Sequence, residues 1–234
     1  MTNPQSNNAL QYAVDIVMCI DATGSMAHTL EEVKGNALGF DRRLAEAMAG
    51  KGKAISQLRL KVIAFRDFGD RPEDAIQQTD FLVFPDQAPE YERFVKGLRP
   101  DGGGDVPESG LEALALALQA PWERGLDRRR HVVVVFTDAP AHPLGSPTQT
   151  RSRLYPQSIP RSMDALFEQW GFAQSGSALM ENGAKRLLMF APEESPWTEI
   201  ADDWNNTLFF PSEAGEGLEE YEMDEIINTI ANSL

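Results

Sequence analysis

The chain has 234 residues, of which 42% are hydrophobic and 24% charged, and its formal net charge is −15 at pH 7. The apolar fraction is sufficient for one sizeable core. The acidic surface repels phosphate backbones, so we expect no nucleic-acid partner, and no run approaches the roughly 18 apolar residues of a membrane span.

The chain opens with polar residues, and we predict a flexible tail over residues 1–12 followed by a single domain over residues 13–234. The tail has neither the basic head nor the apolar core of a signal peptide. The first predicted strand, "AVDIVMCI", is short and apolar and is followed directly by Asp21. Its Cys19 is the chain's one cysteine, which fits a buried thiol in a reducing cytoplasm, where we expect the protein to be located.

Apolar residues at spacings of three and four predict a long helix over residues 26–48. A glycine-rich loop, "RPDGGGDVPES", lies further along the chain. The predicted elements between residues 58 and 119 are a strand (58–65), a polar connection (66–78), a strand (79–84), a helix (88–98) and a helix (107–119).

The stretch "HVVVVFTDAP" contains the strongest predicted strand, because five consecutive apolar residues indicate burial on both faces. It leads to Asp138. The segment over 139–159 is longer than a typical connection, so it is either disordered or a functional loop above the sheet. The remaining predictions are a helix (162–174), a helical turn (178–182), a strand (186–191), a helix (196–204), a strand (207–210) and a helix (219–233).

Alternation of strands and helices predicts an α/β fold. We expect a doubly wound, mostly parallel six-stranded sheet with one antiparallel edge strand and helices on both faces. In such sheets ligands bind at the carboxyl ends of the strands.

Two of the predicted strands lead to aspartates, Asp21 and Asp138, which should lie at this same edge. Thr23 and Ser25 place hydroxyl groups at alternate positions after Asp21. Carboxylates and hydroxyls are hard oxygen donors that suit Mg²⁺, Mn²⁺ or Ca²⁺. The sequence therefore predicts an oxygen-rich cation site.

The stretch "DATGSM" after an apolar strand resembles the Asp-x-Ser/Thr-x-Ser motif of von Willebrand factor type A domains. That motif opens the metal-ion-dependent adhesion site of the family. The stretches "GGGDVPESGLEAL" and "VVVVFTDAP" are similar to its second and third loops. The resemblance implies a Rossmann-like fold and five metal-site residues, namely Asp21, Thr23, Ser25, Asp105 and Asp138.

Asp105 departs from the family pattern, which usually has threonine at this position. A third carboxylate would raise metal affinity and weaken the pull of the ion on a partner's carboxylate. Asp105 could instead cap the helix that begins with Pro107, or pair with Arg99. Glu108 and Asp67 are candidates for supporting the site, although Asp67 could equally belong to an exposed acidic turn.

The resemblance implies a protein-binding module, and the sequence has neither a nucleophile elbow nor a Walker loop, so we expect no enzyme activity. A partner protein would bind the metal face and residues 139–159. The chain looks most similar to bacterial cytoplasmic stand-alone members of the family. This resemblance implies an adaptor in an intracellular complex, for example in a signalling or tellurium-resistance system. The alternatives are a metal-dependent phosphoesterase with Asp21 as phosphate acceptor, and a metal-free scaffold.

Overall fold

The computed structural model describes residues 10–36, 39–103, 107–125, 128–172, 176–216, 218 and 221–234. Its sheet has the strand order β3-β2-β1-β5-β6-β7, and β4 also pairs with β2. Strands β1, β2, β5, β6 and β7 are parallel to their neighbours in this order, whereas β3 and β4 are antiparallel to β2. The strands are β1 (Leu10–Asp21), β2 (Lys53–Phe65), β3 (Ile76–Gln78), β4 (Leu82–Phe84), β5 (Arg129–Phe136), β6 (Lys185–Pro192) and β7 (Thr207–Ser212).

Two short strands share one edge of the sheet. β3 pairs with residues 63–65 of β2, and β4 pairs with residues 58–60. The predicted mostly parallel α/β fold is confirmed, but the sheet has seven strands and not six, because the antiparallel edge is divided between these two segments. Residues 76–78, predicted as part of a polar connection, form one of them.

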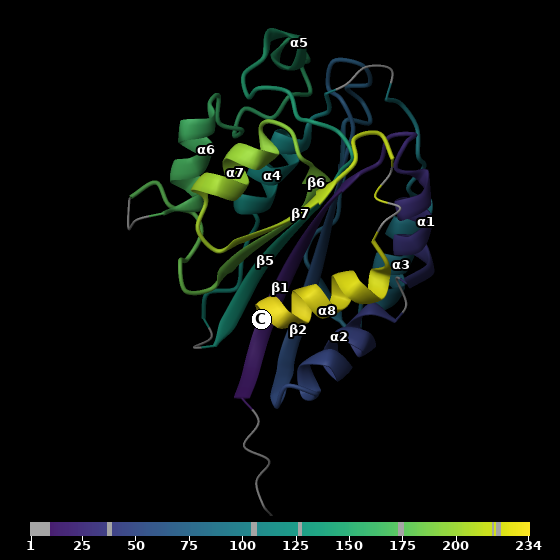
Figure 1. Ribbon diagram of the computed structural model, residues 1–234, viewed down its shortest axis with the longest axis vertical. Helices are drawn as coiled ribbons and strands as arrows, with labels where there is room; N and C mark the ends of the chain where they lie inside the picture. Colours follow the sequence, from purple (N-terminus) through teal and green to yellow (C-terminus); the bar gives the residue numbers. More distant parts are fainter. Residues whose placement is uncertain are drawn as a thin grey trace, which may run out of the picture.

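Helices cover both faces of the sheet, as predicted (Figure 1). One core lies beneath α1, α2, α3 and α8, and the other beneath α4, α6 and α7. Alternate residues of β1 point into the two cores, with Ile16 in the first and Val17 in the second. The helices are α1 (Ala27–Asn36), α2 (Phe40–Ala49), α3 (Ala88–Gly97), α4 (Gly110–Leu118), α5 (Pro147–Thr150), α6 (Met163–Trp170), α7 (Trp197–Asp203) and α8 (Met223–Ser233).

Several boundaries differ from the sequence prediction. β1 already includes residues 10–12, which were assigned to the tail, and the remaining tail residues lie outside the described part of the chain. The predicted helix over 26–48 is two helices, α1 and α2, and the predicted helical turn over 178–182 is not helical.

The predicted buried residues are confirmed as core. Cys19 is a free, buried thiol, and Trp170, Trp197 and Trp204 pack in the second core. None of the helices in the described part of the chain combines the length and apolar character that a bilayer crossing requires.

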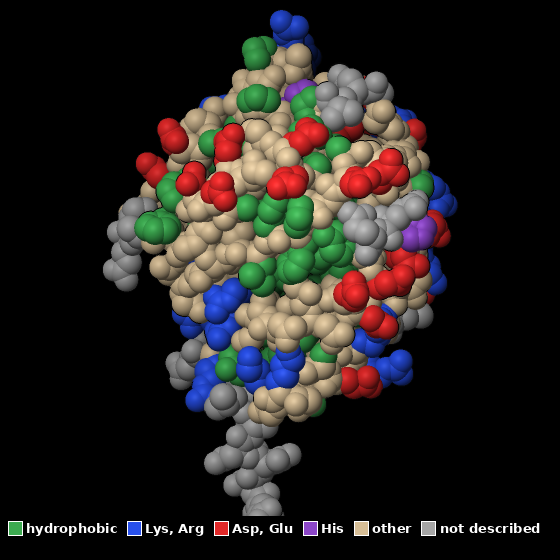
Figure 2. Space-filling model, viewed as in Figure 1, with side chains coloured by type: hydrophobic (Ala, Val, Ile, Leu, Met, Phe, Trp, Pro, Cys, Tyr) green, Lys and Arg blue, Asp and Glu red, His purple; other side chains and the backbone are tan. Residues whose placement is uncertain are grey.

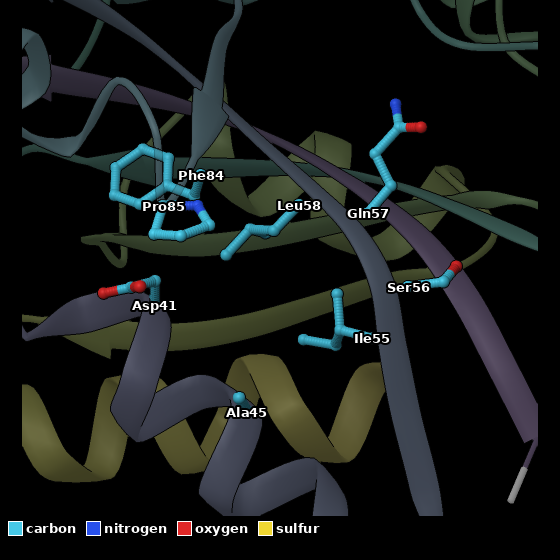
Figure 3. A pocket seen from close by; sticks show the side chains of 8 residues that line it. All are labelled: Asp41, Ala45, Ile55, Ser56, Gln57, Leu58, Phe84 and Pro85. Atoms are coloured by element: carbon cyan, nitrogen blue, oxygen red, sulfur yellow. The ribbon is translucent and has the colours of Figure 1, made fainter.

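A hollow of about 220 Å³ lies beside the first half of β2, between α2 and the end of β4 (Figure 3). Among its lining residues only Asp41 is ionisable. The others are small, apolar or amide side chains, so this hollow does not gather chemistry-bearing groups. The residues of the predicted metal site lie at the opposite end of the strands.

Candidate metal centre

Two acidic residues of the centre, Asp21 and Asp138, lie at or just after the ends of neighbouring strands. β1 ends at Asp21, and its Ile20 pairs with Phe136 at the end of β5. Asp138 follows two residues later. Asp21 is fully buried and Asp138 is 2% exposed, so two carboxylates are held side by side at the carboxyl edge of the sheet.

The carboxylate of Asp21 accepts hydrogen bonds at both oxygens. Its Oδ1 accepts from the Thr23 amide at 2.9 Å and from Thr23 Oγ1 at 2.6 Å, and its Oδ2 accepts from Thr137 Oγ1 at 2.7 Å. Burial raises the pKa of Asp21 to about 6, and the charge of Asp138 adds to this, while the hydrogen bonds oppose it. A nearby cation would favour the ionised form.

The two hydroxyl groups of the first loop link the two aspartates. Ser25 Oγ donates to Asp138 Oδ1 at 3.0 Å, and Thr23 Oγ1 lies 3.4 Å from Ser25 Oγ. The oxygens of Asp21, Thr23, Ser25 and Asp138 therefore form one connected chain. The structure brings these four predicted residues together, whereas Asp105 lies outside the described residues.

The second loop approaches the first through its backbone. The Gly24 amide donates to the Gly102 carbonyl at 3.2 Å, and the Asp101 amide donates to the Ala22 carbonyl at 3.1 Å. Gly102 and Gly103 both have φ near +90°, and a Cβ on Gly103 would lie 3.4 Å from the Cβ of Thr23. The left-handed backbone is the reason that glycine is needed at both positions, because a Cβ at Gly103 would make only an ordinary contact with Thr23.

The donor set fits a hard divalent cation. Two carboxylates and two hydroxyls supply oxygen atoms only, which Mg²⁺, Mn²⁺ and Ca²⁺ prefer. Within the described ranges no group of three Asp, Glu, His or Cys side chains is placed to hold a metal ion, so there a cation would also need hydroxyl ligands. The hydroxyls of Thr23 and Ser25 lie where they could supply them.

The segment over 139–159 is folded and packs on the second core. It contains α5 and buries Leu144, Tyr155 and Ile159. Its backbone also pairs with the loop before α4, because the Glu108 amide donates to Pro140 and the His142 amide donates to Glu108, both at 3.0 Å. The disordered alternative for this segment is therefore not observed.

A buried polar cluster ties this segment to the end of β2. Asp67 is 6% exposed, and its Oδ1 accepts from Gln149 Nε2 and lies 3.4 Å from both Ser109 Oγ and His142 Nε2. Ser109 Oγ also donates to Gln149 Oε1 at 2.7 Å. Asp67 is thus an interior anchor of the segment and not part of an exposed acidic turn.

The sequence analysis missed Thr137 and Gln149. Thr137 precedes Asp138 directly at the end of β5, which is the signal that could have identified it. Gln149 had no comparable signal, because its partners Asp67 and Ser109 lie 82 and 40 residues away in the sequence.

The open, mostly parallel sheet, with carboxylates and hydroxyls at the carboxyl ends of its central strands, defines a Rossmann-like domain. The family model described as von Willebrand factor A domain matches residues 15–146, more than half of the chain. The chain therefore belongs to the von Willebrand factor A domain family, whose members are protein-interaction modules.

Known proteins share parts of this chain. It is 27% identical over 150 residues to the alpha-protein kinase vwkA of Dictyostelium discoideum. This match covers 64% of this chain and 22% of the kinase. The chain spans less than a quarter of the length of the curated relatives it matches. Among solved structures, the pilus adhesin SpaC of Lactobacillus rhamnosus GG aligns with a TM-score of 0.55 at 11% identity, over 96% of this chain and 30% of the adhesin.

Proposed function

We propose that this domain is a divalent-cation-dependent protein-binding module. Asp21, Thr23, Ser25 and Asp138 would hold Mg²⁺, Mn²⁺ or Ca²⁺ at the edge of the sheet. A bound ion offers a coordination position to an oxygen atom of a partner protein. The observation that supports this proposal is the connected chain of oxygens from Asp21 to Asp138.

The charges around the centre support a cation. Asp21 and Asp138 are both buried and adjacent, so their like charges oppose each other unless a positive charge lies between them. The positive charge of Arg66 also interacts with Asp21. However, the guanidinium group of Arg66 donates its hydrogen bonds to the backbone carbonyls of Asp74, Arg99 and Asp101.

The segment over 139–159 provides a second part of the proposed partner surface. Leu154 is 55% exposed, and Arg151 and Arg153 are exposed beside it. Figure 2 shows basic and hydrophobic side chains at the end of the molecule where α5 lies. These side chains suit a partner whose surface combines carboxylates with an apolar contact.

We also propose that the domain acts as an adaptor in an intracellular complex and not as an enzyme. Both oxygens of Asp21 accept hydrogen bonds from the hydroxyls of Thr23 and Thr137, which fixes this carboxylate in place as a ligand beside Asp138. A family relative, the Dictyostelium kinase, is more than four times as long as its match to this chain. This supports a binding domain that works beside other domains or proteins.

Thermal unfolding tests the metal site directly. The protein is melted in EDTA and then with Mg²⁺, Mn²⁺ or Ca²⁺ at matched ionic strength. An ion at about a hundred times its dissociation constant should add about 2.7 kcal/mol, or roughly 5–10 °C in Tm. Ser25→Ala and Asp21→Asn should abolish the rise.

Ser56→Ala is the matched control, because it also removes one hydroxyl hydrogen bond, to the Tyr12 carbonyl at 3.1 Å, but lies at the other end of the sheet. It should keep the full rise. An equal rise in Ser25→Ala and in the wild-type protein would show that the ion binds elsewhere.

A further inference from the structure

The negative charge of the protein is concentrated in its last third. Between Ser162 and Leu234 the sequence has fifteen carboxylate side chains and two basic ones, Lys185 and Arg186, so this part carries a net charge of −13 out of −15. Lys185 is buried against two carbonyls, and Arg186 donates to the backbone of Ser233 and Lys185. Figure 2 shows acidic side chains gathered over α6 and α7.

A groove of about 500 Å³ lies between α6 and α7. Its floor is aromatic, formed by Phe167, Phe172 and Trp204. The ring of Phe167 lies 6.0 Å from each of the other two, measured between centroids, and Trp204 is stacked on the buried Trp170 at 5.4 Å. Phe167 and Trp204 are therefore held by the core, and Phe172 lies against the ring of Phe167.

Phe172 is 56% exposed, although an aromatic ring of this size is strongly stabilised by burial. An exposed aromatic ring that borders a groove marks a surface that can bury further area when a partner binds.

The rim of the groove is acidic. Asp164, Glu199 and Asp203 line it, and all three are exposed. Within the described part of the chain none of the three forms an ion pair with a lysine or arginine. The rim therefore offers three carboxylates that have no ion-pair partner among the described residues, although Glu199 accepts a hydrogen bond from Ser195 Oγ at 2.7 Å.

We propose that this groove is a second docking site, which takes an arginine- or lysine-bearing segment of a partner protein. A guanidinium or ammonium group over the rings of Phe167 and Phe172 gains cation–π attraction, and the three carboxylates surround it. The aliphatic stem of the same side chain covers the aromatic floor. Charge complementarity selects a basic segment over a neutral or acidic one.

This site is separate from the metal centre. The groove is built from α6, Phe172, α7 and Trp204. The metal centre is built from the residues at the ends of β1 and β5. Binding of a basic segment should therefore be the same in EDTA, in Mg²⁺ and in the Ser25→Ala variant. Failure of the proposed metal function leaves this site intact.

The probe is a short fluorescent peptide with arginine at every third position and leucine and alanine between, and its control has glutamine in place of each arginine. Anisotropy is measured at physiological salt in EDTA. The wild-type protein should bind the arginine peptide at least about tenfold more tightly than the glutamine peptide. Equal affinity for the two peptides, or no binding up to about 1 mM, would overturn the proposal.

Two variants locate the binding. The triple variant Asp164→Asn/Glu199→Gln/Asp203→Asn and the single variant Phe172→Ala should each weaken binding by about tenfold or more, and a melt confirms that each remains folded. The matched control, Glu193→Gln/Glu213→Gln/Glu222→Gln, changes the net charge equally but lies outside the groove. It should weaken binding less than about threefold. Equal losses in both triple variants would show diffuse attraction and overturn the site.

Discussion

The Tyr155 hydroxyl donates a hydrogen bond of 3.0 Å to Glu112 Oε1 and joins the segment above the sheet to the first turn of α4. Both side chains are buried. Burial raises the pKa of Glu112 from 4.5 to about 7, although the hydrogen bonds that it accepts act in the opposite direction.

We predict that Glu112 makes the fold less stable as the pH rises from about 5 to 8. In this window the folded state keeps a proton that the unfolded state has released, so stability is lost as the pH rises through the folded pKa. Glu112→Gln removes this titration. In urea unfolding the variant should match the wild-type protein near pH 5 and exceed it by about 1–3 kcal/mol near pH 8.

The exposed Glu193→Gln variant is the control for this measurement and should follow the wild-type protein at both pH values. A constant difference between Glu112→Gln and the wild-type protein from pH 5 to pH 8 would contradict the prediction.

Thr137 should be required for the arrangement of Asp21. Its hydroxyl donates to Asp21 Oδ2, and both side chains are fully buried. Thr137→Val keeps the shape but leaves this oxygen without its donor, which should cost about 1–3 kcal/mol in urea unfolding. Thr137→Ser keeps the hydroxyl and should retain most of the stability. Equal losses in the two variants would assign the effect to packing instead of the hydrogen bond.

Gln149 should hold the segment over 139–159 closed. Gln149→Ala removes the donor to Asp67 and the acceptor for Ser109, and we expect trypsin to cleave after Arg151 and Arg153 faster. A local loss of about 1–2 kcal/mol raises the open population roughly 5–30-fold. Gln87→Ala, on the surface before α3, should leave the cleavage rate unchanged. Unchanged cleavage in Gln149→Ala would show that the apolar contacts alone hold the segment.

Lys185 should make the stability of the folded protein depend on pH in the alkaline range. Its Nζ donates to the carbonyls of Trp170 and Gly171 at 2.7 Å, and burial lowers its pKa from 10.5 to about 8. Between these values the unfolded state binds more protons, so stability should rise with pH relative to Lys185→Met. Urea midpoints at pH 8 and pH 10 check this. A constant difference between the two proteins would contradict it.

The central strands and the first loop of the site could be predicted because their signals are local. A run of valines in β5 indicates burial on both faces, and Asp21, Thr23 and Ser25 lie within five residues of one another. The positions of Asp21 and Asp138 then follow from the rule that parallel strands end at the same edge.

The features that the sequence analysis missed depend on distant partners or on very short elements. β3 and β4 have three residues each, too few for a periodic pattern. The apolar spacing continues across the boundary between α1 and α2, so periodicity could not show that a new helix begins at Phe40. The burial of Asp67 depends on Ser109 and Gln149, which only the folded chain brings near.

The divided edge beside β2 also affects how the protein behaves at high concentration. A strand from another molecule can add to a sheet only where a continuous row of backbone donors and acceptors is free. β3 and β4 already cover two stretches of β2, and at the opposite edge β7 has six residues and includes Pro211. Short, interrupted edges of this kind disfavour aggregation through strand addition.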